Sequence, residues 1–135
     1  MQIIDLTPTD EAAIQQTAVT LVEGFKEMAP NAWPTLESAL EEVQESFGEG
    51  RLSRIAIDAS GAVLGWIGGI STYNGNVWEL HPLVVRPDCQ RQGVGRALVA
   101  DLEEQVRARG GFTIQLGTDD ETNMTSLSGI DLYPN

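Results

Sequence analysis

Apolar and polar residues in the first third of the chain alternate in a way that predicts one strand and two helices. The apolar run 2–6 is typical of a strand. The segment 7–25 is expected to form a helix, with Thr7 as N-cap and Pro8 at the first helical position. A second helix is predicted over 35–47, ending at Gly48, with its acidic residues facing solvent. Its apolar positions are spaced by four, three and four: Leu36, Leu40, Val43 and Phe47.

The middle of the chain predicts three antiparallel strands joined by tight turns. The apolar segments 54–58, 62–73 and 77–85 are separated by "ASG" and "NGN". Asn-Gly between apolar runs is a strong hairpin signal.

A third helix and a last strand follow. The helix is expected to end at Gly110 and Gly111, and the segment 112–120 predicts a strand parallel to 77–85, since a crossover helix joins the two. The apolar positions of the helix recur every four residues: Val94, Leu98, Leu102 and Val106. These elements predict a single α/β (α+β) domain over 1–135 with a mixed sheet.

Charge is distributed unevenly along the chain. The net charge of −12 argues against a nucleic-acid partner, because neutralising phosphates needs clustered Lys and Arg. Residues 1–80 hold three basic residues against twelve acids, whereas five of the eight basic residues lie after Val85. An anion is therefore expected to bind near Arg86 to Arg96. The acidic remainder suits a cationic ligand, with solubility alone as the alternative.

Other signals in the sequence are negative. No apolar run is long enough for a membrane span, and the first residues lack the pattern of a secretory signal, so we expect a cytoplasmic protein with no membrane partner. The single cysteine, Cys89, is expected to be a small loop residue rather than a nucleophile. No Cys/His cluster predicts a metal site.

The turn before the third helix has features of a phosphate-binding backbone. Gly93 and Gly95 mark a strand-to-helix junction, where missing β-carbons let an anion approach the backbone N–H groups. The P-loop pattern is absent, and Leu98 stands where G-x-G-x-x-G requires its third glycine. A tight turn without a ligand is the alternative.

The pattern Gln90-x-x-Gly93-x-Gly95 after "LVVRP" resembles the cofactor motif of the GNAT superfamily of N-acetyltransferases. The segments "WELHPLVV", "RGG", "LGTDD" and "DLY" are also similar, in order and spacing, to the aminoglycoside 6'-N-acetyltransferases, over about residues 60–133. The resemblance implies acetyl-CoA as cosubstrate and the 6'-amine of an aminoglycoside, a cationic small molecule, as acceptor. It implies contacts of the pantetheine arm with Leu83, Val84 and Val85, and of the pyrophosphate with Gln90, Arg91, Gln92, Gly93, Val94, Gly95 and Arg96.

Two side chains beside this motif suit acetyl transfer to an amine. Glu79 and His81 are two apart on a strand and so share a face, with Trp78 and Leu80 on the other. Because the reaction needs a neutral amine, a nearby base is useful. Glu79 is the expected base, directly or through water, and His81 its helper or orienter. An ion-paired Glu79 and a satisfied interior His81 are the alternatives.

Pro82 predicts a bulge, because proline has no N–H to donate inside a central strand. A bulge would open a gap beside the strand 112–117 for the pantetheine arm. It would also free the Leu83 N–H to polarise the thioester carbonyl.

Further residues are candidates for contacts with the sugar. Asp119 and Asp120 follow a parallel strand, where ligands of α/β sheets gather, with an ordinary polar turn as the alternative. Tyr73 and Trp33 could stack on a sugar ring, although aromatic residues more often pack.

The chain differs from the superfamily pattern at its C-terminal end. Members continue with another helix and closing strands, whereas this sequence stops at Asn135. Tyr133 does not occupy the context of the family's general acid, so none is assigned. The strand 112–117 is expected to expose an edge, which predicts a homodimer or, as the alternative, a truncated product with reduced stability. Acetylation of another amine, or a non-catalytic acyl-CoA-binding module, are the alternative functions.

Overall fold

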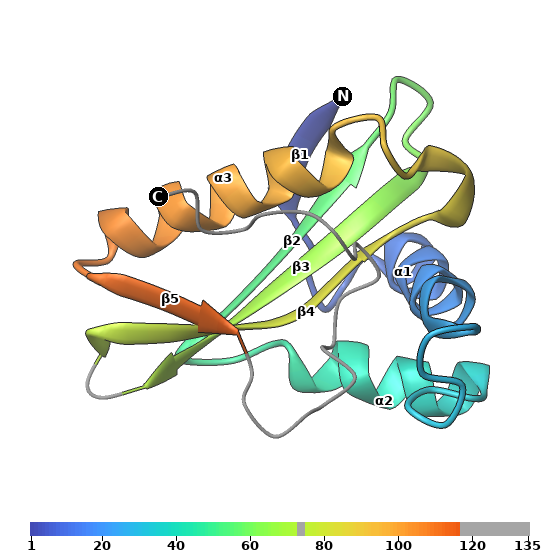
Figure 1. Ribbon diagram of the computed structural model, residues 1–135, viewed down its shortest axis with the longest axis horizontal. Coiled ribbons are helices and arrows are strands. Elements are labelled where there is room, and N and C mark those ends of the chain that lie inside the picture. The colour runs from blue at the N-terminus through green and yellow to red at the C-terminus, as the bar shows by residue number, and fades with distance from the viewer. Residues whose placement is uncertain (73–74, 117–135) are drawn as a thin grey trace.

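The computed structural model describes residues 1–72 and 75–116. Tyr73, Asp119, Asp120 and Tyr133 lie outside these residues. The described elements follow the predicted order of an α/β (α+β) fold (Figure 1). In chain order they are β1 (Gln2–Asp5), α1 (Glu11–Phe25), α2 (Leu36–Glu45), β2 (Arg51–Ile57), β3 (Val63–Thr72), β4 (Val77–Val85), the 3-10 turn η2 (Pro87–Cys89), α3 (Val94–Ala108) and β5 (Thr113–Leu116).

One mixed sheet has the strand order β1-β2-β3-β4-β5. Strands β1 to β4 are antiparallel neighbours, and the β3–β4 hairpin closes with Thr72 opposite Val77, as the turn residues predicted. Strand β5 runs parallel to β4, so the crossover prediction is confirmed.

Helices cover both faces of the sheet. Helix α3 lies on one face, and α1 and α2 lie on the other (Figure 1). The four apolar residues of α3 predicted from their spacing are all buried, at Val94, Leu98, Leu102 and Val106. None of the helices in the described part of the chain is long and apolar enough to cross a membrane.

The start of α1 differs from the prediction. The N-cap is Asp10, whose carboxylate accepts a hydrogen bond from the Ala13 N–H at 3.2 Å. Thr7 instead begins a turn, because its carbonyl accepts the Asp10 N–H at 3.1 Å. Pro8 then takes the second position of that turn, which its fixed φ suits as well as a helix start.

Helix α2 is shorter than the predicted 35–47, and it buries a different set of residues. Ala39 and Val43 are fully buried, whereas Leu36 is 42% exposed. A capping box between Thr35 and Ser38 fixes the start of the helix. The buried stripe therefore follows the small residue Ala39, which a search for large apolar residues overlooks.

Candidate active site

A bulge interrupts β4 at Pro82, as predicted. Ile67 pairs with Leu83 and Gly69 pairs with Leu80, so His81 and Pro82 together lie opposite Gly68. The His81–Pro82 peptide bond is cis. The bulge shifts the alternation of side chains by one residue along the rest of the strand.

This shift decides which β4 residues face α3. Trp78 and Leu80 before the bulge, and Leu83 and Val85 after it, belong to the core that α3 covers. Glu79, between Trp78 and Leu80, therefore projects from the opposite face, the side on which His81 meets α2. The predicted shared face of Glu79 and His81 agrees with this arrangement.

His81 lies beside a glutamate that the sequence analysis assigned to solvent. Nε2 of His81 is 3.6 Å from Oε2 of Glu42, and both side chains are about one-fifth exposed, at 21% and 20%. Glu42 comes three residues after the buried Ala39, and that spacing is the signal that could have placed it toward the sheet. The prediction that all acids of α2 face solvent is wrong at this position.

Trp33 contacts the same glutamate, and Glu42, His81 and Trp33 together form a small polar cluster. Its Nε1–H donates to Oε1 of Glu42 at 3.3 Å, and its ring packs edge-on against Phe25 with centroids 5.0 Å apart. The ring is only 7% exposed, so Trp33 cannot serve as an open platform for a sugar. The packing alternative is the correct one, because Trp33 is buried in the same hydrophobic core as Phe25 and Val43.

The cluster keeps Glu42 ionised. The His81 imidazole, 3.6 Å away, lowers the pKa of Glu42 from its ordinary value, although burial opposes the shift. The Trp33 hydrogen bond and the charge of Arg51 lower it further. Glu42 is therefore a carboxylate at neutral pH.

The direction of the Leu83 N–H follows from the hydrogen bonds of β4 after the bulge. The Arg86 N–H donates to the Leu64 carbonyl at 2.8 Å, which fixes the alternation of bonded pairs along the hairpin. By that alternation the N–H of Leu83 points away from β3. Among the described residues, β5 pairs with β4 only from Val77 to Leu80. The Leu83 N–H therefore lies on the β5 side of β4, beyond the paired stretch.

The turn from β4 into α3 is held by contacts that its own side chains make with each other and with the backbone. Gln90 Nε2 donates to the Val85 carbonyl at 3.2 Å, and Arg86 pairs with Asp88 at 2.7 Å. Arg91 and Gly93 have positive φ values of 66° and 87°. These contacts give the turn a defined shape before any ligand binds.

The same turn leaves backbone donors at the start of α3. Gly93 is the N-cap and provides no side-chain cap. The first N–H groups of a helix have no acceptor within the helix, so those of α3 suit an anion. Gln92, Gly93 and Arg96 are exposed here, whereas Val94 and Gly95 are buried. Arg86 is already paired with Asp88, which leaves Arg91 and Arg96 as the exposed cations nearest the turn.

The match to a family model decides which family this fold and site represent. Residues 18–133 match the acetyltransferase (GNAT) family. The chain belongs to the GNAT acetyltransferase family. A comparison with curated proteins gave no match.

Solved structures of GNAT acetyltransferases extend the comparison. An aminoglycoside 6'-N-acetyltransferase complexed with coenzyme A is 34% identical with a TM-score of 0.75, and the alignment covers 89% of this chain and 63% of that one. An aminoglycoside 6'-acetyltransferase type Ii is 33% identical with a TM-score of 0.75, with 91% and 75% covered. The enzyme from Enterococcus faecium is 34% identical with a TM-score of 0.74, with 89% and 63% covered. The chain thus spans less than two thirds of the length of two of these three structures.

Cys89 is poorly suited to act as a nucleophile. Its side chain is buried, and burial raises the pKa of the thiol above its ordinary value. A protonated, buried thiol is a poor nucleophile. Within residues 1–72 and 75–116, no group of three or more His, Cys, Asp or Glu side chains could hold a metal ion.

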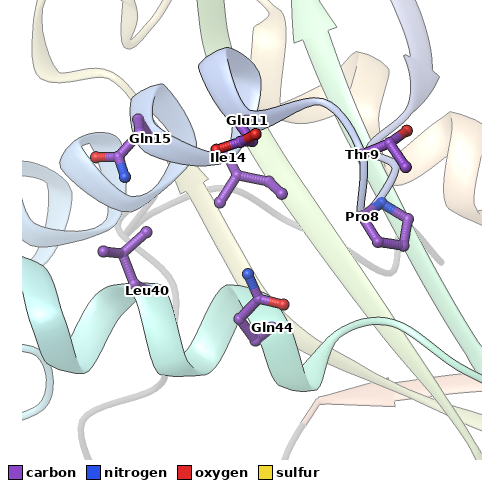
Figure 2. Close-up of a pocket in the computed structure, with 7 residues that line it drawn as sticks. All are labelled: Pro8, Thr9, Glu11, Ile14, Gln15, Leu40 and Gln44. Carbon is purple, nitrogen blue, oxygen red and sulfur yellow. The ribbon is translucent and has the colours of Figure 1, made fainter.

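A hollow between α1 and α2 lies apart from these residues (Figure 2). None of the residues predicted for the site lines it. Its lining residues are Pro8, Thr9, Glu11, Ile14, Gln15, Leu40 and Gln44.

Proposed function

We propose that this chain is an acetyl-CoA-dependent N-acetyltransferase that acts on the 6'-amine of aminoglycosides. The observation that carries the proposal is strand β4, on which Glu79 and His81 share one face and the Leu83 N–H after the bulge points toward β5, directly ahead of the Gln90–Arg96 turn. The similarity to aminoglycoside 6'-N-acetyltransferases, one of them complexed with coenzyme A, supports the choice of donor and acceptor.

The backbone ahead of and within the turn supplies the donor site. The diphosphate of acetyl-CoA is held by the N–H groups from Gln90 to Arg96, with Arg91 and Arg96 adding positive charge. The pantetheine arm lies along Leu83, Val84 and Val85. A β-carbon added at Gly93 would have no atom within 4 Å. The space beside this glycine is therefore open for the phosphates.

The reaction then needs a base and a donor for the carbonyl oxygen. Glu79, directly or through water, takes a proton from the ammonium, and the free amine attacks the thioester carbon. The Leu83 N–H stabilises the negative oxygen that develops, which by analogy with measured oxyanion holes contributes about 3 kcal/mol. The C–S bond breaks as the amide forms, the amide nitrogen releases its second proton to water, and the thiolate takes a proton from water, since no general acid is assigned.

Thiol release tests the proposal directly. Acetyl-CoA is mixed with kanamycin, and free thiol is measured with a chromogenic disulfide. Release that depends on kanamycin, and that falls roughly 100-fold in Glu79→Gln, supports the proposal. A parallel panel of polyamines and peptide amines identifies another acceptor if one is preferred.

Binding separates a catalyst from a binding module. Thermal stabilisation by coenzyme A, without thiol release for any acceptor and without an effect of Glu79→Gln, would assign a non-catalytic acyl-CoA-binding role. The homodimer expected from the sequence stays a prediction, which light scattering in solution tests.

A further inference from the structure

We propose that a hollow beside the end of β1 binds a small organic anion, with Arg51 and Arg109 holding its carboxylate or phosphate group. The hollow measures about 240 Å³ and is lined from the ends of β1, α2 and α3 and from the start of β2. Its described lining includes no residue of the proposed acetyl-transfer site. The inference therefore goes beyond the proposed function and does not depend on it.

The hollow lies at the opposite end of α3 from the turn proposed for the diphosphate. Gly93 caps the start of the helix, and Arg109 caps its end (Figure 1). At about 1.5 Å per residue, the 15 residues of α3 span roughly 20 Å. An anion held by Arg109 is therefore separate from the diphosphate of acetyl-CoA.

The hollow opens because β1 ends before it reaches the start of β2. Their register ends with Asp5 opposite Arg54, and the Leu6 N–H adds one hydrogen bond to the Ser53 carbonyl at 2.9 Å. The chain then turns away toward α1. Arg51, at the start of β2, is therefore left without a partner residue in β1.

The backbone of β2 directs a donor into this opening. On the β3 side, the Gly50 carbonyl accepts the Ser71 N–H at 2.8 Å, whereas the Ser53 carbonyl accepts on the β1 side. Polar backbone groups of successive strand residues point alternately to the two sides. By that alternation the N–H of Arg51 points to the β1 side, so one residue brings both its guanidinium and a backbone donor to the hollow.

Two arginines give the wall of the hollow a positive charge. Within the part of the chain that the structure describes, neither Arg51 nor Arg109 takes part in an ion pair. The charge of Arg51 acts on Glu42 only from a longer distance. Asp5 also lines the hollow, but its carboxylate is bound by Arg54 at 2.9 Å. The positive charge is therefore left for a ligand, in a chain whose net charge is −12.

The buried hydroxyl groups in the wall are already bonded. Ser46 donates to the Val43 carbonyl, and Ser53 accepts the indole N–H of Trp66 at 2.8 Å. The two serine oxygens are also 3.0 Å apart, within hydrogen-bond distance of each other. The arginines and the Arg51 N–H are thus the donors that an anion would use.

The rest of the lining indicates an anion with an apolar body. Leu6 and Leu52 are buried in the wall, and Phe47 is half-buried beside them. A guanidinium binds a carboxylate or a phosphate through two parallel hydrogen bonds. The volume suits a small molecule such as benzoate or phenyl phosphate.

NMR of the arginine side chains tests the site in the native protein. The Nε–H signals are assigned from the variants Arg51→Gln, Arg109→Gln, Arg107→Gln and Arg96→Gln, each of which removes one signal. Benzoate and phenyl phosphate are then titrated separately. We expect the Arg51 and Arg109 signals to shift along one shared saturation curve, and the tighter of the two probes identifies the preferred acidic group.

Arg107→Gln is the matched control for Arg109→Gln. Both residues are exposed at the same end of α3, but Arg107 does not line the hollow. Calorimetry should show roughly tenfold weaker binding of the preferred probe in Arg109→Gln and Arg51→Gln, and unchanged binding in Arg107→Gln. Equal losses in Arg107→Gln and Arg109→Gln would overturn the site. If Arg51→Gln fails to fold, Arg109→Gln and the native titration still decide.

Arg96 separates the hollow from the diphosphate turn. Arg96→Gln should weaken binding of coenzyme A and leave binding of benzoate unchanged. Benzoate that shifts the Arg96 signal alone would assign the anion to the turn and overturn the proposal. Shifts of all arginine signals without saturation would show only charge screening, and they would overturn it as well.

Discussion

The α-carbon of Gly68 faces the carbonyl oxygen of His81 so closely that a β-carbon would lie 2.5 Å from that oxygen. The bulge in β4 therefore depends on a glycine in the neighbouring strand. Neither backbone segment can move without altering the pairing of Leu80 and Leu83 with β3.

Gly68→Ala should disturb the bulge and destabilise the fold. The added methyl group meets backbone rather than a flexible side chain, so we expect a loss of about 1–3 kcal/mol in the free energy of unfolding and a lower kcat. Urea denaturation and thiol release measure the two effects. Gly69→Ala is the control, because its nearest neighbour is the end of the Leu102 side chain at 3.1 Å, which can shift. Equal losses in both variants would contradict this role of Gly68.

Gly93→Ala should weaken binding of coenzyme A. Gly93 has a φ of 87°, and alanine pays a backbone penalty of about 1 kcal/mol there. Its methyl group also enters the space proposed for the diphosphate, so calorimetry should show roughly tenfold weaker binding.

Gly61→Ala is the matched control for Gly93. It has the same φ of 87° and no atom within 4 Å of an added β-carbon, but it lies in the turn between Asp58 and Ala62. It should lose similar stability and keep its affinity for coenzyme A. A parallel loss of affinity would mean that backbone strain, not the phosphate site, explains Gly93→Ala.

Arg54 joins β1, β2 and α3 through unequal ion pairs. It donates two hydrogen bonds to Asp101, at 2.8 and 2.9 Å, and one to Asp5 at 2.9 Å. Asp101 is 14% exposed and Asp5 is 67% exposed. Asp101→Asn should therefore cost about 1.5–3 kcal/mol, and Asp5→Asn less than about 1 kcal/mol, in urea denaturation. The reverse order would refute this account of the network.

The stability that Glu42 contributes should depend on pH. Because its pKa is lowered in the folded state, its contribution is present above the ordinary value of 4.5 and is lost as the pH falls through the lowered value. The difference in unfolding free energy between the native protein and Glu42→Gln should shrink from pH 6 to pH 3. Glu41→Gln should show no such trend, and a difference that grows in acid would contradict the assignment.

Much of the site could be predicted because its signals are local. Pro82 lacks an N–H, so a bulge follows wherever the strand is central, and the period of two places Glu79 with His81. The glycine at position 93 similarly marks the strand-to-helix junction, and it is the N-cap of α3.

The errors lie where two local solutions have similar energies. Thr7 and Asp10 are both good N-caps, and the turn formed by Thr7 and Pro8 decided between them. Trp33 could face solvent or the core on composition alone, and its packing on Phe25 decided that.

The sequence by itself determined the order of the elements, the parallel β4–β5 crossover and the bulge, because periodicity, chain connection and proline chemistry act within a few residues. Only the tertiary structure decided that Glu42 meets His81. That contact joins a helix and a strand far apart in the chain, and it depends on how α2 rotates when Ala39 and Val43 bury against the sheet. No local pattern encodes such a rotation, since it is set by packing between elements.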